Sequence, residues 1–237
     1  MDEHILKSYD DELNHLQSLI AEMGGLAETQ LARAINALVR ADSEAAAALI
    51  ENDRRIDQLE AEIDDFSVRM IAKRQPLAYD LRRIITGLKV ASNLERIGDY
   101  AKNIAKRTVT IAHAPGLRGP VATIARMGAL VQGMIKNVLD AYIAQDSAKA
   151  DDVRARDFEV DQLHSAMFRE LLTYMMEDPR NITACTHLLF IAKNVERIGD
   201  HVTGVAEQVH YMVHGEMPSD ERPKRDETGI TLDNSAK

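Results

Sequence analysis

The chain has 237 residues, which is enough for one sizeable hydrophobic core or for two small ones. Its net charge is −9 and aromatic residues make up only 4%, so it lacks the basic surface and the stacking side chains that a nucleic-acid-binding protein uses. The abundance of Ala, Leu, Ile, Glu and Arg, with few Gly and Pro, favours helices.

Apolar residues at three-to-four spacing predict six helices and no strand, so the expected fold class is all-α. The six predicted helices run over residues 5–41, 43–73, 79–113, 121–144, 147–177 and 181–214. Asp42, Pro76 and Pro179 mark turns between successive helices, and Gly215 is expected to cap the last one.

Two segments lack helical periodicity. Residues 115–120 contain two prolines and two glycines, which is typical of a linker. From Glu216 onward the chain is polar and aperiodic, which is typical of a disordered tail. The predicted domains are therefore residues 1–114 and 121–215, joined by residues 115–120 and followed by the tail at 216–237.

The sequence also favours a cytoplasmic location. Cys185 is the only cysteine, so no disulfide can form within the chain, and its place on an apolar stripe suggests small core filler, not a nucleophile. The first residues, Met1–His4, lack the basic region and apolar run of a secretory signal. The longest strongly apolar stretch, Leu188–Ala192, is far shorter than a membrane span.

The pentapeptide Glu-Arg-Ile-Gly-Asp occurs twice, at residues 95–99 and 196–200. The similarity extends upstream, where Asp53 and Asp57 correspond to Asp157 and Asp161 at a slightly different offset. A period of about 100 residues is too long for a solenoid repeat and indicates a duplicated small domain. We therefore expect two tandem three-helix bundles.

Each repeat carries two carboxylate pairs with i, i+4 spacing, which places both members of a pair on one helix face. Relative to Glu95, Ile84 and Leu88 lie within about 20° around the helix and Asp99 about 40° away, so the acids fall inside the apolar stripe. Glu196 and Asp200 behave alike, whereas the aspartate pairs border the apolar stripe of their own helices. We call Asp53, Asp57, Glu95 and Asp99 the first carboxylate site, and Asp157, Asp161, Glu196 and Asp200 the second.

Four clustered acids need a counter-charge if they are buried. Arg96 and Arg197 are expected to point away from the acids, and Lys102 under the first pair is replaced by the uncharged Thr203 under the second. A divalent metal is therefore the favoured counter-charge, and all-oxygen ligands suit Mg²⁺ or Mn²⁺, with iron also possible. The alternative is a set of hydrated acids at the bundle rim that bind no ion.

Gly98 and Gly199 lie inside the two pentapeptides, where a mid-helix glycine costs about 1 kcal/mol relative to alanine. We interpret them as points where a neighbouring helix or a ligand comes close.

With these motifs the sequence resembles the PhoU family of bacterial phosphate-signalling accessory proteins. The resemblance extends to about His214 and is carried by both Asn-x-Glu-Arg-Ile-Gly-Asp blocks, at residues 93–99 and 194–200. It implies two three-helix bundles and metal binding at the two carboxylate sites, with Mg, Mn, Fe or Zn as candidate ions. One departure is that both Asp-x-x-x-Asp motifs begin with the shorter aspartate, which bears on cluster size and metal preference.

The resemblance also implies a function. Members of the family repress the phosphate starvation response by coupling the phosphate ABC transporter, through its ATPase subunit, to a membrane-bound sensor histidine kinase. They are cytoplasmic, commonly homodimeric, and not established as enzymes. A chain of this kind would meet the membrane only through its partners.

Two other functions are compatible with the pattern. A ferritin-like di-metal carboxylate enzyme uses Glu-x-x-His pairs, which Glu207 with His210 fits and Asp161 with His164 fits loosely. The pattern is not duplicated in the first repeat, so these histidines are interpreted as surface or rim residues. The second alternative is a helical scaffold whose metal is incidental.

Overall fold

The computed structural model describes residues 2–51, 54–112 and 117–219, and they form helices with no strand among them. The all-α prediction is confirmed. The helices are α1 (Asp2–Arg40), α2 (Ser43–Glu51), α3 (Arg54–Arg74), α4 (Ala78–Ile111), α5 (Arg118–Ala144), α6 (Ser147–Glu177), the 3-10 helix η1 (Pro179–Asn181) and α7 (Ile182–His214).

The predicted second helix, over residues 43–73, is described as two elements, α2 up to Glu51 and α3 from Arg54 onward. Asn52 and Asp53, between these two elements, lie outside the described residues. The apolar seam nevertheless continues, since Leu49 and Ile56 are both buried.

Polar side chains and one glycine fix several helix ends. The Oδ1 atom of Asp42 accepts a hydrogen bond of 2.9 Å from the backbone N–H of Ala45 at the start of α2. Gly215 adopts the left-handed conformation with a φ of 86° and donates its N–H to the carbonyl of Tyr211, as predicted. α5 begins at Arg118, so the last residues of the expected linker are helical.

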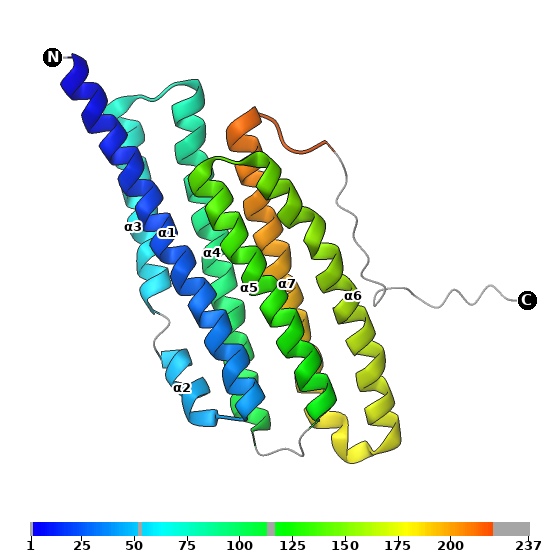
Figure 1. Ribbon diagram of the computed structural model, residues 1–237. Coiled ribbons are helices and arrows are strands. Elements are labelled where there is room, and N and C mark those ends of the chain that lie inside the picture. The colour runs from blue at the N-terminus through cyan, green and yellow to red at the C-terminus, as the bar shows by residue number, and fades with distance from the viewer. Residues whose placement is uncertain (1, 52–53, 113–116, 220–237) are drawn as a thin grey trace, which may run out of the picture.

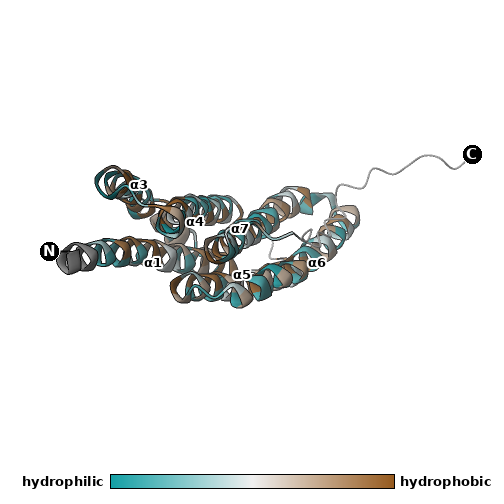
Figure 2. Ribbon diagram, turned by 90° about the horizontal axis from the view of Figure 1, so that it is seen from above, coloured by the Kyte–Doolittle hydropathy of each residue, from teal (hydrophilic) through white to brown (hydrophobic). Residues whose placement is uncertain are grey.

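The helices lie side by side as an elongated row, with α3 and α6 at opposite ends and the other long helices between them (Figure 1; Figure 2). α1 packs on α2, α3 and α4, and α5 packs on α6 and α7. The two groups meet through α4 against α7, the most extensive helix pair, and through α1 against α5. The hydrophobic core is therefore continuous from one group to the other.

α4 and α7 run antiparallel, and polar side chains connect them near the middle. Asn93 of α4 lies 2.9 Å from the Nδ1 atom of His201 on α7, measured from its Oδ1 atom. Arg197 donates a hydrogen bond of 3.2 Å to the hydroxyl of Tyr100, and the guanidinium of Arg107 lies 4.1 Å from the ring centroid of Phe190. The contact between α4 and α7 thus includes residues within or close beside the two pentapeptides.

Cys185 is buried in this core, which agrees with its interpretation as core filler. Within the described part of the chain, no helix combines the length and apolarity that crossing a membrane requires.

Candidate metal centre

The second carboxylate site is built by α6 and α7 and is largely buried. Asp157 and Asp161 on α6 are only 2% and 4% exposed, and Glu196 on α7 is 6% exposed. Asp200 is half-buried. The prediction that the aspartate pair borders the apolar stripe is wrong here, because α6 packs along α7 closely enough to cover both carboxylates.

The first carboxylate site is built by α3 and α4 and is more open. Glu95 is half-buried, with 17% of its side chain exposed, and Asp99 keeps 41% exposed. Asp57 in the first turn of α3 is exposed. Asp53 lies outside the described residues, so the structure describes three of the four predicted members.

Both pentapeptide glycines lie where another helix comes close. A Cβ atom built on Gly199 would sit 2.7 Å from the Oδ1 atom of Asp157, and one on Gly98 would sit 2.9 Å from the Cδ1 atom of Ile56. These are the corresponding helix pairs of the two repeats, α6 with α7 and α3 with α4. The interpretation of the glycines as close-approach points is confirmed.

Burial and like charges act on the glutamates of both sites. Burial, reinforced by the neighbouring Asp99, raises the pKa of Glu95 to about 7. Burial also raises the pKa of Glu196, and the carboxylates of Asp200 and Asp161 push it in the same direction. Groups that resist ionisation in this way would gain from a bound cation.

Two basic residues reach the acids, and the sequence did not indicate either. The Nζ atom of Lys193 lies 2.9 Å from the Oε1 atom of Glu196, whereas its counterpart in the first repeat is Ser92. Arg96 was expected to point away, but its Nε atom lies 3.5 Å from Glu95 and its Nη1 atom 3.9 Å from Asp99. Long side chains fold back along a helix, which a count of helix angles does not capture. Arg197 does leave its own acids, for Tyr100.

Glu60 on α3 is a further acidic residue of the first site that sequence reasoning missed as a site member. Its pKa is raised by burial and by the carboxylates of Asp64, Asp57 and Asp99, so it shares their electrostatic environment. In the repeat alignment it corresponds to His164. The signal that could have found it is the spacing of three residues from Asp57, on the same helix face.

The donor chemistry suits a hard cation, but the side chains are not gathered around one point. The described residues include no group of three or more His, Cys, Asp or Glu side chains placed to hold an ion together. No described residue donates a hydrogen bond to the buried Oε2 atom of Glu196. A buried acceptor oxygen among carboxylates fits a metal ligand, although ligation would need side-chain rotation.

Of the two histidines of the ferritin-like alternative, one is not the surface or rim residue that the sequence predicts. His164 is buried, with 5% exposure. His210 is half-buried, and its Nδ1 atom lies 3.3 Å from the Oδ1 atom of Asp151. The fit of Glu-x-x-His remains unduplicated, because Glu60 and Val109 hold the corresponding positions of the first repeat.

Comparison with known proteins agrees with the duplicated architecture. The family model described as "PhoU domain" matches residues 20–108 and again residues 124–209. A protein of Caulobacter vibrioides strain NA1000 / CB15N, named phosphate-specific transport system accessory protein PhoU homolog, is 51% identical over 226 residues, which cover 95% of this chain and 98% of that protein. A protein of the same name from Rhizobium meliloti strain 1021 is 47% identical over 225 residues, covering 95% of each chain.

Solved structures show the same fold. The crystal structure of PhoU from Pseudomonas aeruginosa superposes with a TM-score of 0.84 at 40% identity, covering 88% of this chain and all of that one. The crystal structure of the phosphate transport system regulatory protein PhoU from Streptococcus pneumoniae gives a TM-score of 0.83 at 28% identity, covering 89% and 99%. With its two matched domains and its relatives along nearly the whole length, this chain belongs to the PhoU family.

Proposed function

We propose that this chain is a regulatory adaptor of phosphate transport and not an enzyme. The observation that carries the proposal is the 51% identity to an accessory protein of the phosphate-specific transport system over 95% of this chain. The matched 226 residues span both repeats. The Streptococcus pneumoniae relative, titled a regulatory protein of the phosphate transport system, supports the same role.

In this role the chain keeps phosphate uptake and starvation signalling off when phosphate is plentiful. It does so as a cytoplasmic homodimer that contacts the ATPase subunit of the phosphate ABC transporter and the sensor histidine kinase. The basis is the family resemblance. The acidic net charge and scarce aromatic residues are consistent with protein partners in place of nucleic acid.

The adaptor would carry divalent metal at its two carboxylate sites. The residues that would hold it are Asp57, Glu95 and Asp99 with Asp53 in the first site, and Asp157, Asp161, Glu196 and Asp200 in the second. Bound metal would supply positive charge that lets the buried carboxylates ionise and ties α3 to α4 and α6 to α7. Oxygen-only ligands favour Mg²⁺ or Mn²⁺, and iron or zinc is a further candidate.

A scaffold with incidental metal is the second candidate, because the described acids do not converge on one point. Binding of purified protein to the transporter ATPase, with and without a chelator, separates the two. The metal-dependent adaptor predicts weaker or altered binding after chelation. Unchanged binding would favour the scaffold.

Deletion of the gene tests the regulatory role. We expect a phosphate-starvation promoter fused to a reporter to become active in phosphate-rich medium when the gene is removed, and to be repressed again when the gene is restored. A deletion strain that keeps normal repression would contradict the proposed function.

A further inference from the structure

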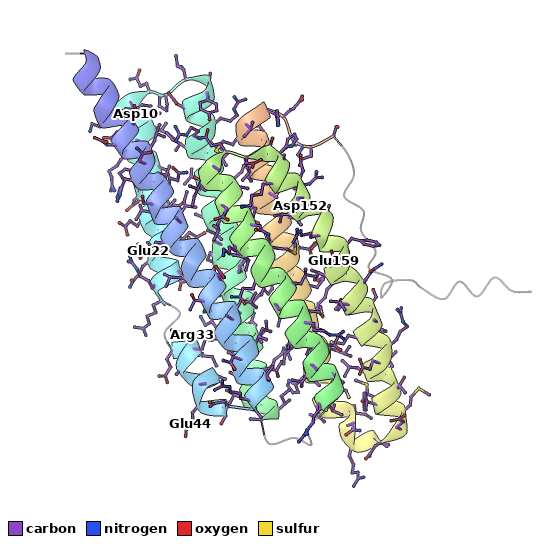
Figure 3. The ribbon with its side chains drawn as sticks, in the orientation of Figure 1. Asp10, Glu22, Arg33, Glu44, Asp152 and Glu159 are labelled. Carbon is purple, nitrogen blue, oxygen red and sulfur yellow. The ribbon has the colours of Figure 1, made fainter. Side chains whose placement is uncertain are left out.

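A pocket of about 380 Å³ lies between α1, α2 and the start of α3, and Asp57, Glu95 and Asp99 are not among its lining residues. Figure 3 labels Arg33 on α1, at the height where α2 lies beside it. A volume of this size falls in the range of small-molecule binding sites. Neither the fold nor the proposed regulatory role requires a cavity here.

Three arginines line this pocket in a chain whose net charge is −9. Arg33 and Arg40 come from α1 and Arg55 from the first turn of α3. Within the described residues, no carboxylate lies in salt-bridge range of Arg33 or Arg40. An acidic protein that gathers cationic side chains around one cavity is equipped for an anion.

Two carboxylates offset part of the positive charge, but the lining of the pocket keeps three arginines to one aspartate. Asp42 lines the pocket, and its Oδ1 atom accepts the backbone N–H of Ala45 and so caps α2. Arg55 is bound to Glu22 at 2.7 Å, with 48% of each side chain exposed. An exposed pair of this kind is worth little, so Arg55 can turn toward a ligand at small cost.

The pocket also has an apolar side that a bare inorganic ion would not use. Leu49 and Ile56, both largely buried, and the half-buried Leu26 form part of its lining. Arg33 and Arg40 lie two turns apart on α1, which is about 10 Å along the helix axis. A ligand that satisfies both arginines must therefore be extended or carry several oxyanions, and must also present an apolar body.

We propose that this pocket binds an organic di- or triphosphate of nucleotide size. The phosphates would contact Arg33 and Arg40, whose guanidinium groups match phosphate oxygens in a bidentate geometry, and the apolar body would pack on Leu26, Leu49 and Ile56. A single carboxylate is satisfied by one arginine, so this spacing favours the multiply charged ligand.

The inner wall of the pocket contacts the first pentapeptide. The side chains of Gln30 and Ile56 both line the pocket, and they are also the atoms nearest to a Cβ built on Gly98, at 3.3 and 2.9 Å. A ligand that shifts Ile56 thereby acts on the helix that carries Glu95 and Asp99. Binding of a soluble phosphate compound in the pocket would thereby be coupled to the first carboxylate site.

Calorimetric titration of the full chain in the presence of EDTA tests the proposal separately from metal binding. ADP and ATP should bind saturably, one per chain, whereas adenosine and inorganic phosphate should each bind at least about tenfold more weakly because each offers only half of the contacts. Arg33→Ala and Arg40→Ala should each weaken ADP binding about tenfold or more, as expected for a charged hydrogen bond. Ala48→Phe, which fills the pocket without changing its charge, should also weaken it.

Arg156→Ala is the matched control, since Arg156 is an exposed helical arginine in an ion pair with Asp152 at 2.9 Å, far from the pocket. It should leave ADP binding unchanged, and circular dichroism should show every variant folded. The proposal is overturned if neither ADP nor ATP saturates, if the two pocket arginines can be removed without effect, or if a short polyglutamate peptide binds in place of the nucleotides. None of these outcomes bears on phosphate repression, so the proposed function stands or falls independently.

Discussion

At the scale of single residues, Gly199 lies at a close contact between α6 and α7. Its missing side chain leaves room for the Oδ1 atom of Asp157, which a Cβ would approach to 2.7 Å. The oxygen belongs to a buried carboxylate with 2% exposure, so it has little space to retreat. The glycine is therefore the condition for packing α6 on α7 at the second carboxylate site.

Gly199→Ala should lower the free energy of unfolding by about 1–3 kcal/mol, as overpacking in a dense core does. Gly133 on α5 is the control, because nothing lies within 4 Å of a Cβ built there. Gly133→Ala should instead raise stability by about 0.5–1 kcal/mol through higher helix propensity. Urea unfolding of both variants measures the difference, and equal effects would contradict the close approach.

The raised pKa of Glu95 predicts a pH dependence of stability in metal-free protein. Between the usual glutamate value of 4.5 and the folded value of about 7, the folded state binds more protons than the unfolded state. The free energy of unfolding should therefore fall as pH rises through this window. Urea titrations in EDTA from pH 4.5 to 8 measure the slope.

Glu95→Gln should reduce this slope and should stabilise the metal-free protein at pH 8. Some slope should persist, since burial raises the pKa of Glu60 and Glu196 in the same direction. A slope that Glu95→Gln leaves unchanged would show that another group titrates.

Prediction of single residues from the sequence succeeded where the angular position around one helix determines burial. It failed where a neighbouring helix or a long side chain determines the surroundings of the residue. The angular position of Glu196 indicated an apolar stripe, and the residue is buried. The same angular estimate placed Asp157 at the edge of the apolar stripe, because the estimate considers α6 alone and ignores α7, which covers the residue. It also missed Lys193, whose long side chain reaches Glu196 from three residues away.

At the scale of elements, the ends of the helices follow from local chemistry. α6 has the bounds that its sequence predicts, and α7 differs by one residue because Pro179 and the two following residues form a 3-10 turn. The apolar seam predicted over residues 43–73 is confirmed on both sides of the residues that the structure leaves undescribed, since Leu49 of α2 and Ile56 of α3 are both buried.

The antiparallel contact of α4 with α7 was not visible in the sequence, since no pattern within one helix names its partner. It can be tested through Arg107 and Phe190, whose guanidinium and ring lie 4.1 Å apart. A double-mutant cycle with Arg107→Gln and Phe190→Leu should give a coupling of about 0.5–1 kcal/mol, the usual size of a cation–π contact at an exposed site. Additive effects in urea unfolding would contradict the contact.

At the scale of the whole molecule, the two repeats share a fold but not an environment. The second site is enclosed by α6 and α7 and contacts Lys193, whereas the first is more open and is joined by Glu60. We expect the two sites to bind divalent metal with different affinities, the more open and more acidic first site binding hard cations without displacing a lysine. The duplication was readable from the sequence, but this asymmetry was not, because it arises from how tightly each helix pair closes.

Titration of the chelated protein with Mn²⁺, followed by calorimetry, should resolve two classes of site. Asp99→Asn should remove one class and Asp200→Asn the other, and thermal unfolding should shift upward with added metal only while a site remains. Metal content that survives the double substitution would reject the assignment of both sites.

Complementation of the deletion strain tests most directly whether this chain is a metal-dependent regulatory adaptor of phosphate transport. A phosphate-starvation reporter would be measured in phosphate-rich medium with the wild-type gene, or with the Asp99→Asn, Asp200→Asn double variant produced at the same level. We expect the wild-type chain to restore repression and the double variant to leave the reporter active. Full repression by the double variant would contradict a role for the metal, and repression in the uncomplemented deletion strain would contradict the regulatory function itself.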